Sequence, residues 1–130
     1  MNRSLRPDGW PRPRGYNHGI AAAGTQIFVA GQIGWSEHTR LVSSDFGEQA
    51  AQALRNVAAV LASGGASPEH VVRLTWYVTD KTEYSGALKR IGSAYREIFG
   101  KHYPAMTLVQ VTALLEDGAK VEIEATAVVP

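Results

Sequence analysis

The 130-residue sequence contains no cysteine, which excludes disulfide bonds, thiolate nucleophiles and cysteine-ligated metal sites. It also has no apolar run close to the roughly 18 residues that a membrane-spanning helix needs. The N-terminal segment lacks the apolar stretch of a secretory signal peptide. Together these absences predict a soluble cytoplasmic protein that does not contact the membrane.

Motifs for metal, phosphate and nucleophilic chemistry are missing as well. The four histidines, His18, His38, His70 and His102, do not have the spacing of metal ligands. No glycine-rich loop is followed by a lysine that could reach a phosphate. The serines lack the strand–turn–helix pattern of a nucleophile elbow. We therefore expect no metal ion and no cofactor.

The net charge is +1, but its distribution is uneven. Four of the thirteen basic residues, Arg3, Arg6, Arg12 and Arg14, lie in the first 14 positions, where Asp8 is the single acidic residue. The rest of the chain carries nine basic and eleven acidic residues. A body with net negative charge is a poor match for a phosphate backbone. Nucleic-acid binding is not expected beyond weak contacts through the basic segment.

Residues 1–15 contain three of the six prolines and two glycines, which predicts an irregular N-terminal arm. Residues 16–130 predict a single domain, because 45% of the sequence is hydrophobic and the length suits one core. Alternating or β-rich segments predict strands at 16–23, 25–33, 71–79, 106–112 and 119–128.

Two amphipathic stripes predict helices between these strands. The first follows a capping box of Asp45 and Glu48 and ends at Gly64-Gly65; the second follows Asp80 and Glu83 and ends at Gly100. The turn Glu116-Asp117-Gly118 predicts a hairpin between the last two strands. The order β-β-α-β-α-β-β is an α+β layout, with both helices packed on one face of the sheet.

The alternation also assigns side chains to sheet faces. In the last strand, Val121, Ile123, Ala125 and Ala127 are expected to face the helices, with Glu122 and Glu124 on the opposite face. In the middle strand, Val72, Leu74, Trp76 and Val78 share one face, and Val71, Arg73, Thr75 and Tyr77 share the other. A broad, partly apolar second face invites association. We therefore expect an oligomer with this face at a subunit boundary.

Several segments, in order and with matching spacing, resemble the RidA (YjgF/YER057c/UK114) family over about residues 15–129. They are Ile27–Ile33, Gln52–Val57, Val71–Asp80, Tyr103–Val111 and Val121–Ala125. The resemblance implies a chorismate-mutase-like fold with a mixed sheet, assembled as a homotrimer. It further implies small-molecule pockets between subunits, in which family members hydrolyse reactive enamines and imines.

Individual positions carry over from this resemblance. Glu122 is similar to the catalytic acid that positions water, and Tyr16 to a pocket tyrosine. Gly31 is similar to a glycine whose backbone approaches the ligand, and Thr107 follows the position of a substrate-binding arginine. That arginine, directly after Pro-Ala in the family, is Met106 here. The alternative for Glu122 is a solvated carboxylate, and for Tyr16 an aromatic anchor of the strand start.

Met106 changes the expected chemistry. An arginine binds a carboxylate through two charge-assisted hydrogen bonds, and their loss costs on the order of 1.5–3 kcal/mol. We therefore expect 2-imino acids to bind and turn over poorly, and Met106→Arg to improve the hydrolysis of 2-aminoacrylate-type imines. Ala30 is a second departure, since many members have serine there. His18 and His102 are candidates to replace the lost positive charge. With Tyr103, Trp35 and Trp76, Met106 forms either an apolar pocket or interface packing.

Three functions remain open at this point. The first is a small-metabolite pocket protein acting as an enamine or imine deaminase, a hydrolase with a non-standard substrate. The second is a binding or regulatory protein that has lost the chemistry. The third is the endoribonuclease activity whose label accompanies this family, which the acidic body disfavours.

Overall fold

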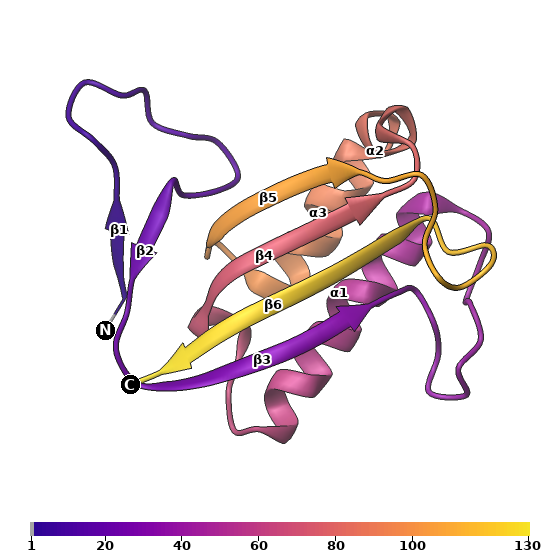
Figure 1. Cartoon of the computed structure of the whole chain (residues 1–130), viewed down its shortest axis with the longest axis horizontal. Helices are drawn as coiled ribbons and strands as arrows, with labels where there is room; N and C mark the ends of the chain where they lie inside the picture. Colours follow the sequence, from indigo (N-terminus) through magenta and orange to yellow (C-terminus); the bar gives the residue numbers. More distant parts are fainter. Residues whose placement is uncertain (1) are drawn as a thin grey trace.

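The computed structural model describes residues 2–130, and a four-stranded mixed sheet forms its centre (Figure 1). The order across the sheet is β3-β6-β4-β5, with β4 and β5 parallel and the other two pairs antiparallel. Strands β3 and β5 are therefore the two edges. The strands are β3 (Thr25–Gln32), β4 (Val71–Val78), β5 (Ala105–Gln110) and β6 (Val121–Val129).

Helix α1 (Phe46–Ser63) forms where the sequence supplies a cap and a glycine stop. Asp45 is the N-cap, and its carboxylate accepts a 2.9 Å hydrogen bond from the backbone N–H of Glu48. At the other end Gly65 takes a φ of 76°, a left-handed conformation that favours glycine. Both predicted ends of this helix are confirmed.

The second predicted helix is two helices, α2 (Lys81–Gly86) and α3 (Leu88–Phe99). Ala87 separates them, with φ −110° and ψ 9°, and its N–H bonds to the carbonyl of Tyr84. Gly100, at φ 63°, ends α3 as predicted. A single 3-10 turn, η1 (Pro68–His70), leads into β4.

All three α-helices cover the same face of the sheet, which confirms the α+β layout (Figure 1). The residues of β6 expected to face the helices are all buried, from Val121 to Ala127 at alternate positions. They pack with a core centred on Trp76, Leu54 and Leu74. No helix within residues 2–130 combines the length and apolar character that crossing a bilayer requires.

The predicted hairpin between the last two strands is wrong, because β4 lies between β5 and β6. Helices α2 and α3 form a crossover that delivers β5 parallel to β4 at the outer edge. Strand β6 then occupies the central place between β4 and β3. Gly118, at φ 85°, helps the chain turn in the connecting loop instead.

Two smaller predictions also differ from the structure. Val71 was expected on the face away from the helices, but it is fully buried, because a bulge between Val71 and Arg73 shifts the pairing with β6. The arm expected to be irregular contains β1 (Arg3–Leu5), which pairs antiparallel with β2 (Gly19–Ala21). This short ribbon lies beside the main sheet (Figure 1).

The sheet face away from the helices mixes polar and apolar side chains. Phe28 on β3 is 71% exposed there, and Val109 on β5 is also exposed. Glu122 and Glu124 on β6 lie between them on the same face, as predicted from the alternation. We refer to this surface as the open face.

Candidate functional site

The open face carries a pair of carboxylates in two different environments. Glu122 pairs with Tyr77 of β4, and Glu124 lies two residues further along β6. The Tyr77 hydroxyl donates a 2.6 Å hydrogen bond to Oε1 of Glu124, and this bond, with burial and the two nearby carboxylates, raises the pKa of Tyr77. Within residues 2–130 no side chain donates a hydrogen bond to Glu122. Glu122 is thus the carboxylate available to water or a ligand.

Gly31 lies directly against Glu122. The β3–β6 register shifts between Val29 and Gln32, and Gly31 lies in this bulge with the Glu122 side chain packed against it. A methyl group on Gly31 would stand 2.7 Å from Cδ of Glu122 and closer still to its Oε2. Only glycine leaves the carboxylate room in this position. The structure therefore brings together two of the residues singled out from the sequence.

Thr107 shares the open face but lies further away. It pairs with Thr75 of β4, so one strand separates it from β6. Its side chain is exposed and forms no hydrogen bond within the described chain.

Met106 faces the helices, because it pairs with Leu74, whose side chain is buried. It lines a cavity of about 210 Å³ between the sheet and helices α2 and α3. We call this space the Met106 cavity. Its other lining residues are Gly15, Trp76, Tyr84, Leu88, Ile91, Gly92, Tyr95, Arg96 and Tyr103.

Aromatic rings build one wall of the Met106 cavity. Tyr95 stacks on Tyr103 with ring centroids 5.5 Å apart and planes 8° apart. Burial raises the pKa of Tyr95, and the nearby Tyr103 adds to the shift, so its hydroxyl stays protonated. That hydroxyl donates a 2.6 Å hydrogen bond to the carbonyl of His102. The wall is therefore fixed by packing and by one hydrogen bond.

Tyr16 lies on the arm beside the start of β5. Its neighbour Asn17 donates a 3.0 Å backbone hydrogen bond to the carbonyl of Pro104, and the Asn17 side chain bonds to the carbonyl of Tyr103. The exposed Tyr16 ring meets His18 edge to face at 5.4 Å. Tyr16 is therefore held near the Met106 side of the molecule, away from Glu122.

The histidines considered as replacement cations have different surroundings. His102 Nε2 donates a 2.6 Å hydrogen bond to the carbonyl of Val71. This bond links the segment that precedes β5 to the first residue of β4. His18 lies in an exposed aromatic cluster, with Trp10 5.0 Å away on one side and Tyr16 on the other. The structure gives neither histidine a place in the lining of the Met106 cavity.

Within the chain, Met106 and Glu122 lie on opposite faces of the sheet. Gly31 and Met106 also belong to the two edge strands, β3 and β5. The predicted residues thus fall into two groups. Glu122 and Gly31, with Thr107 on the same face, form one group, and Met106 with Tyr16 nearby forms the other. Neither group alone contains both a carboxylate and a ligand cavity.

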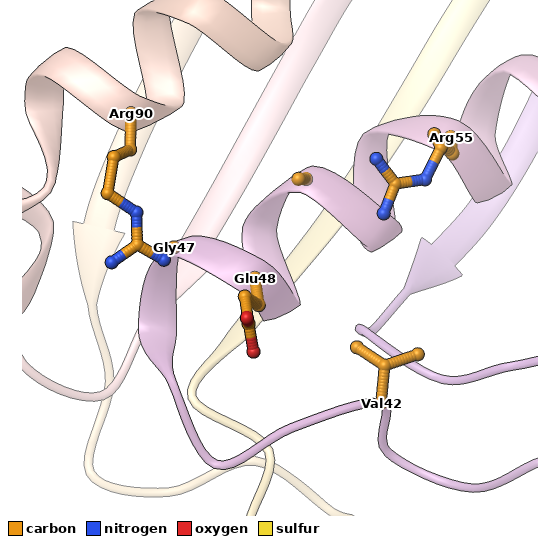
Figure 2. Close-up of a pocket in the computed structure, with 6 residues that line it drawn as sticks. Val42, Gly47, Glu48, Arg55 and Arg90 are labelled. Atoms are coloured by element: carbon orange, nitrogen blue, oxygen red, sulfur yellow. The ribbon is translucent and has the colours of Figure 1, made fainter.

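A larger hollow of about 460 Å³ lies at the first turns of α1 (Figure 2). In Figure 2, Arg90 of α3 and Arg55 of α1 lie on either side of Glu48. Both guanidinium groups are already engaged. Arg90 forms an ion pair with Asp45, and Arg55 bonds to Oε1 of Gln52 at 3.0 Å. The Arg90 hydrogen bond also lowers the pKa of Asp45. Neither arginine is therefore free to act as a ligand-binding cation in this hollow without breaking a contact within the chain.

Sequence reasoning missed two features of the Met106 cavity. Arg96 of α3 is one of the residues that line the cavity. The periodicity of a helix or strand does not predict which side chains of α3 lie near those of β5. Trp76 is 2% exposed, and its indole Nε1 has no hydrogen-bond partner within residues 2–130. The described residues also contain no cluster of three histidine, aspartate or glutamate side chains that could hold a metal ion.

Comparison with known proteins gives consistent likenesses over nearly the whole chain. The sequence model of the family described as endoribonuclease L-PSP matches residues 11–129. The chain is 30% identical over 132 residues to the 2-iminobutanoate/2-iminopropanoate deaminase of Salmonella typhimurium, covering 98% of both proteins. It is similar to the crystal structure of the Rid-family protein YyfB from Yersinia pestis, with a TM-score of 0.86, 32% identity and 98% coverage of both chains. Escherichia coli TdcF with bound serine gives a TM-score of 0.69 at 30% identity, covering 98% of this chain and 99% of the other.

Proposed function

Because the chain belongs to the RidA (YjgF/YER057c/UK114) family, we propose that it hydrolyses an imine or enamine of a small metabolite, with Glu122 as the acid–base group. The observation that carries this proposal is the contact of the Glu122 carboxylate with Gly31. A bare backbone at Gly31 gives a ligand access to the carboxylate. Tyr77 is turned to Glu124, which leaves Glu122 able to exchange a proton.

The proposed reaction uses one water molecule and releases ammonia. An enamine first gains a proton on carbon and loses one from nitrogen, which gives the imine. Glu122 takes a proton from water as the water oxygen attacks the imine carbon, and this proton passes to nitrogen, which gives a carbinolamine. Glu122 then takes the hydroxyl proton of the carbinolamine and gives it to the nitrogen. The carbon–nitrogen bond breaks as this nitrogen leaves as ammonia, and the carbon keeps the oxygen as a carbonyl. No redox partner is needed, and the carboxylate ends the cycle in its starting state.

We further propose that the site is completed between copies of the chain in a homotrimer. Exposed Phe28 and Val109 on the open face favour burial against another copy. A head-to-tail contact that brings the β5 edge of one protomer to the β3 edge of the next can close into a ring. Such a ring places Met106 of one copy near Gly31 and Glu122 of its neighbour. It would join the two groups that a single protomer keeps apart.

Met106 disfavours small 2-imino acids as substrates, because it cannot bind their carboxylate. A thioether offers polarisable apolar contact and no bidentate partner for a carboxylate. The relatives named for 2-iminobutanoate and 2-iminopropanoate act on small imines. We infer that this chain acts on a different imine, one that uses the apolar lining of the Met106 cavity.

RNA cleavage fits the site less well, although the matching family is described as an endoribonuclease. Glu122 and Glu124 put negative charge at the proposed site on the open face, which disfavours a phosphate group there. Binding without catalysis remains the competing outcome, and turnover distinguishes it.

The test is imine hydrolysis by the purified protein and two matched variants. Imines are generated from single amino acids by an amino-acid oxidase, with semicarbazide as a competing trap, and 2-oxo-acid release is followed. Glu122→Gln should lose turnover by about 10²–10⁴-fold, the usual contribution of an acid–base group. Glu124→Gln, on the same strand face but bonded to Tyr77, should retain most activity. Equal losses in both variants, or none in either, would remove Glu122 from this role.

A further inference from the structure

We propose that Arg96 supplies the carboxylate-binding cation that Met106 does not, and that the Met106 cavity receives the aromatic or large apolar side chain of a 2-imino acid. This inference rests on the proposed imine hydrolysis and names its substrate class. It assigns a specificity role to a helix residue that sequence reasoning missed.

The position of Arg96 suits a ligand-binding cation. Arg96 lies one turn after Gly92 on α3, and both line the same cavity as Met106. Its Nη1 would lie 3.5 Å from a methyl group on Gly92, so the guanidinium folds back over the bare backbone of that glycine. Within residues 2–130 Arg96 forms no ion pair, whereas Arg90 on the same helix is held by Asp45. Its hydrogen-bonding edge is therefore not used by the protomer.

The cavity behind Arg96 has the size and lining for a ring. Trp76 and Tyr95 are buried and form its inner part, whereas Arg96 and Leu88 are exposed at its opening. Its volume is about 210 Å³. An apolar cavity of about 150 Å³ is enough to hold benzene.

The positions of Arg96 and the Met106 cavity define how a substrate would lie in the site. The carboxylate binds Arg96 at the opening, the side chain enters the cavity, and the imine carbon between them stays at the opening. There it can meet Glu122 of a neighbouring copy in the assembly proposed above. An imine with a methyl side chain would leave the aromatic wall without contacts, so aromatic imino acids should be preferred.

Binding of stable probes tests the cavity without requiring turnover. Isothermal calorimetry on the full-length protein would compare 3-phenylpropanoate, the neutral 3-phenylpropan-1-ol, and propanoate. Wild type should bind 3-phenylpropanoate most tightly of the three. Arg96→Ala should weaken that binding about tenfold, as expected for loss of a partly exposed charged hydrogen bond, and leave the alcohol unchanged. Arg96→Lys should recover part of the loss.

Lys89→Ala is the matched control, since it removes an exposed positive charge from α3 outside the cavity lining. An equal loss in Lys89→Ala and Arg96→Ala, or no loss in Arg96→Ala, would overturn the assignment. Turnover of the phenylalanine-derived imine separates this result from the proposed function. If wild type and Arg96→Ala hydrolyse it equally, the Arg96 role is wrong and the hydrolase stands. If the binding pattern holds but no imine is hydrolysed, the Arg96 site stands and the hydrolase is wrong.

Discussion

Replacing Gly31 by alanine should disable Glu122 while leaving the fold intact. Gly31 has no positive φ, so its backbone accepts alanine. The three atoms nearest to the new methyl group all belong to the Glu122 side chain, with Cδ at 2.7 Å and Cγ at 2.9 Å. Ordinary carbon–carbon contact is about 3.5–4.0 Å, so the carboxyl group must move by about 1 Å. A displacement of this size from a productive geometry costs about 10²-fold in rate.

The assay follows 2-oxo-acid release from an enzymatically generated imine, with stability measured by urea unfolding. Gly31→Ala should lower kcat about 10²-fold. The free energy of unfolding should change by less than about 1 kcal/mol, because Glu122 is only partly buried and its side chain can rotate. Gly86→Ala is the control, since Gly86 has open space around its Cβ position and no positive φ.

A mutant cycle shows whether Gly31 acts through Glu122. In the Glu122→Gln background the added methyl group should cause little further loss, because the group it displaces no longer transfers a proton. The reasoning fails if Gly31→Ala keeps wild-type kcat. It also fails if the methyl group lowers the residual activity of Glu122→Gln by the same factor as it lowers wild type.

Three further predictions concern stability and specificity. Gln49→Leu should lower the free energy of unfolding in urea by about 2–5 kcal/mol, because the fully buried amide bonds to two carbonyls and one N–H that would lose their partner; a change below 1 kcal/mol would contradict this. Asp45→Asn should lower Tm at neutral pH, because Arg90 holds the Asp45 pKa below its ordinary value. That difference should fade as pH falls from about 4 through the lowered pKa, and a pH-independent difference would argue against the ion pair. Met106→Arg should raise kcat/KM for the serine-derived imine relative to the phenylalanine-derived one, and an unchanged ratio would show that Met106 does not select the substrate.

The alternation of side chains along β6 was enough to predict its burial from sequence. Val121, Ile123, Ala125 and Ala127 lie against the helices, and Glu122 lies opposite, because a strand has a strict two-residue period. The same rule failed at Val71, where a bulge adds a residue and reverses the face. A bulge depends on the partner strand, and periodicity within one strand does not contain that information.

Strand order and the cavity lining depend on contacts between distant segments. The turn at Gly118 was interpreted as a hairpin because neighbouring strands usually pair, but the α2–α3 crossover had already placed β5 at the far edge. Arg96 was missed for the same reason. Its relation to Met106 comes from the packing of α3 over β5, which neither segment encodes alone. Gly31 and Glu122 were each singled out only through the family resemblance, and the contact between them is visible only in the structure.

The central claim is that Glu122 of one protomer works with the Met106 cavity of another. Two variants can test it: Glu122→Gln, and Met106→Trp, which fills the cavity, each first shown to be inactive alone. The two proteins are unfolded together, refolded at equal concentrations and assayed for imine hydrolysis. If the site is shared between protomers, random mixing in a closed ring should restore about a quarter of wild-type activity. If the mixture stays as inactive as the separate variants, although mixed oligomers form, each site lies within one protomer and the account is wrong.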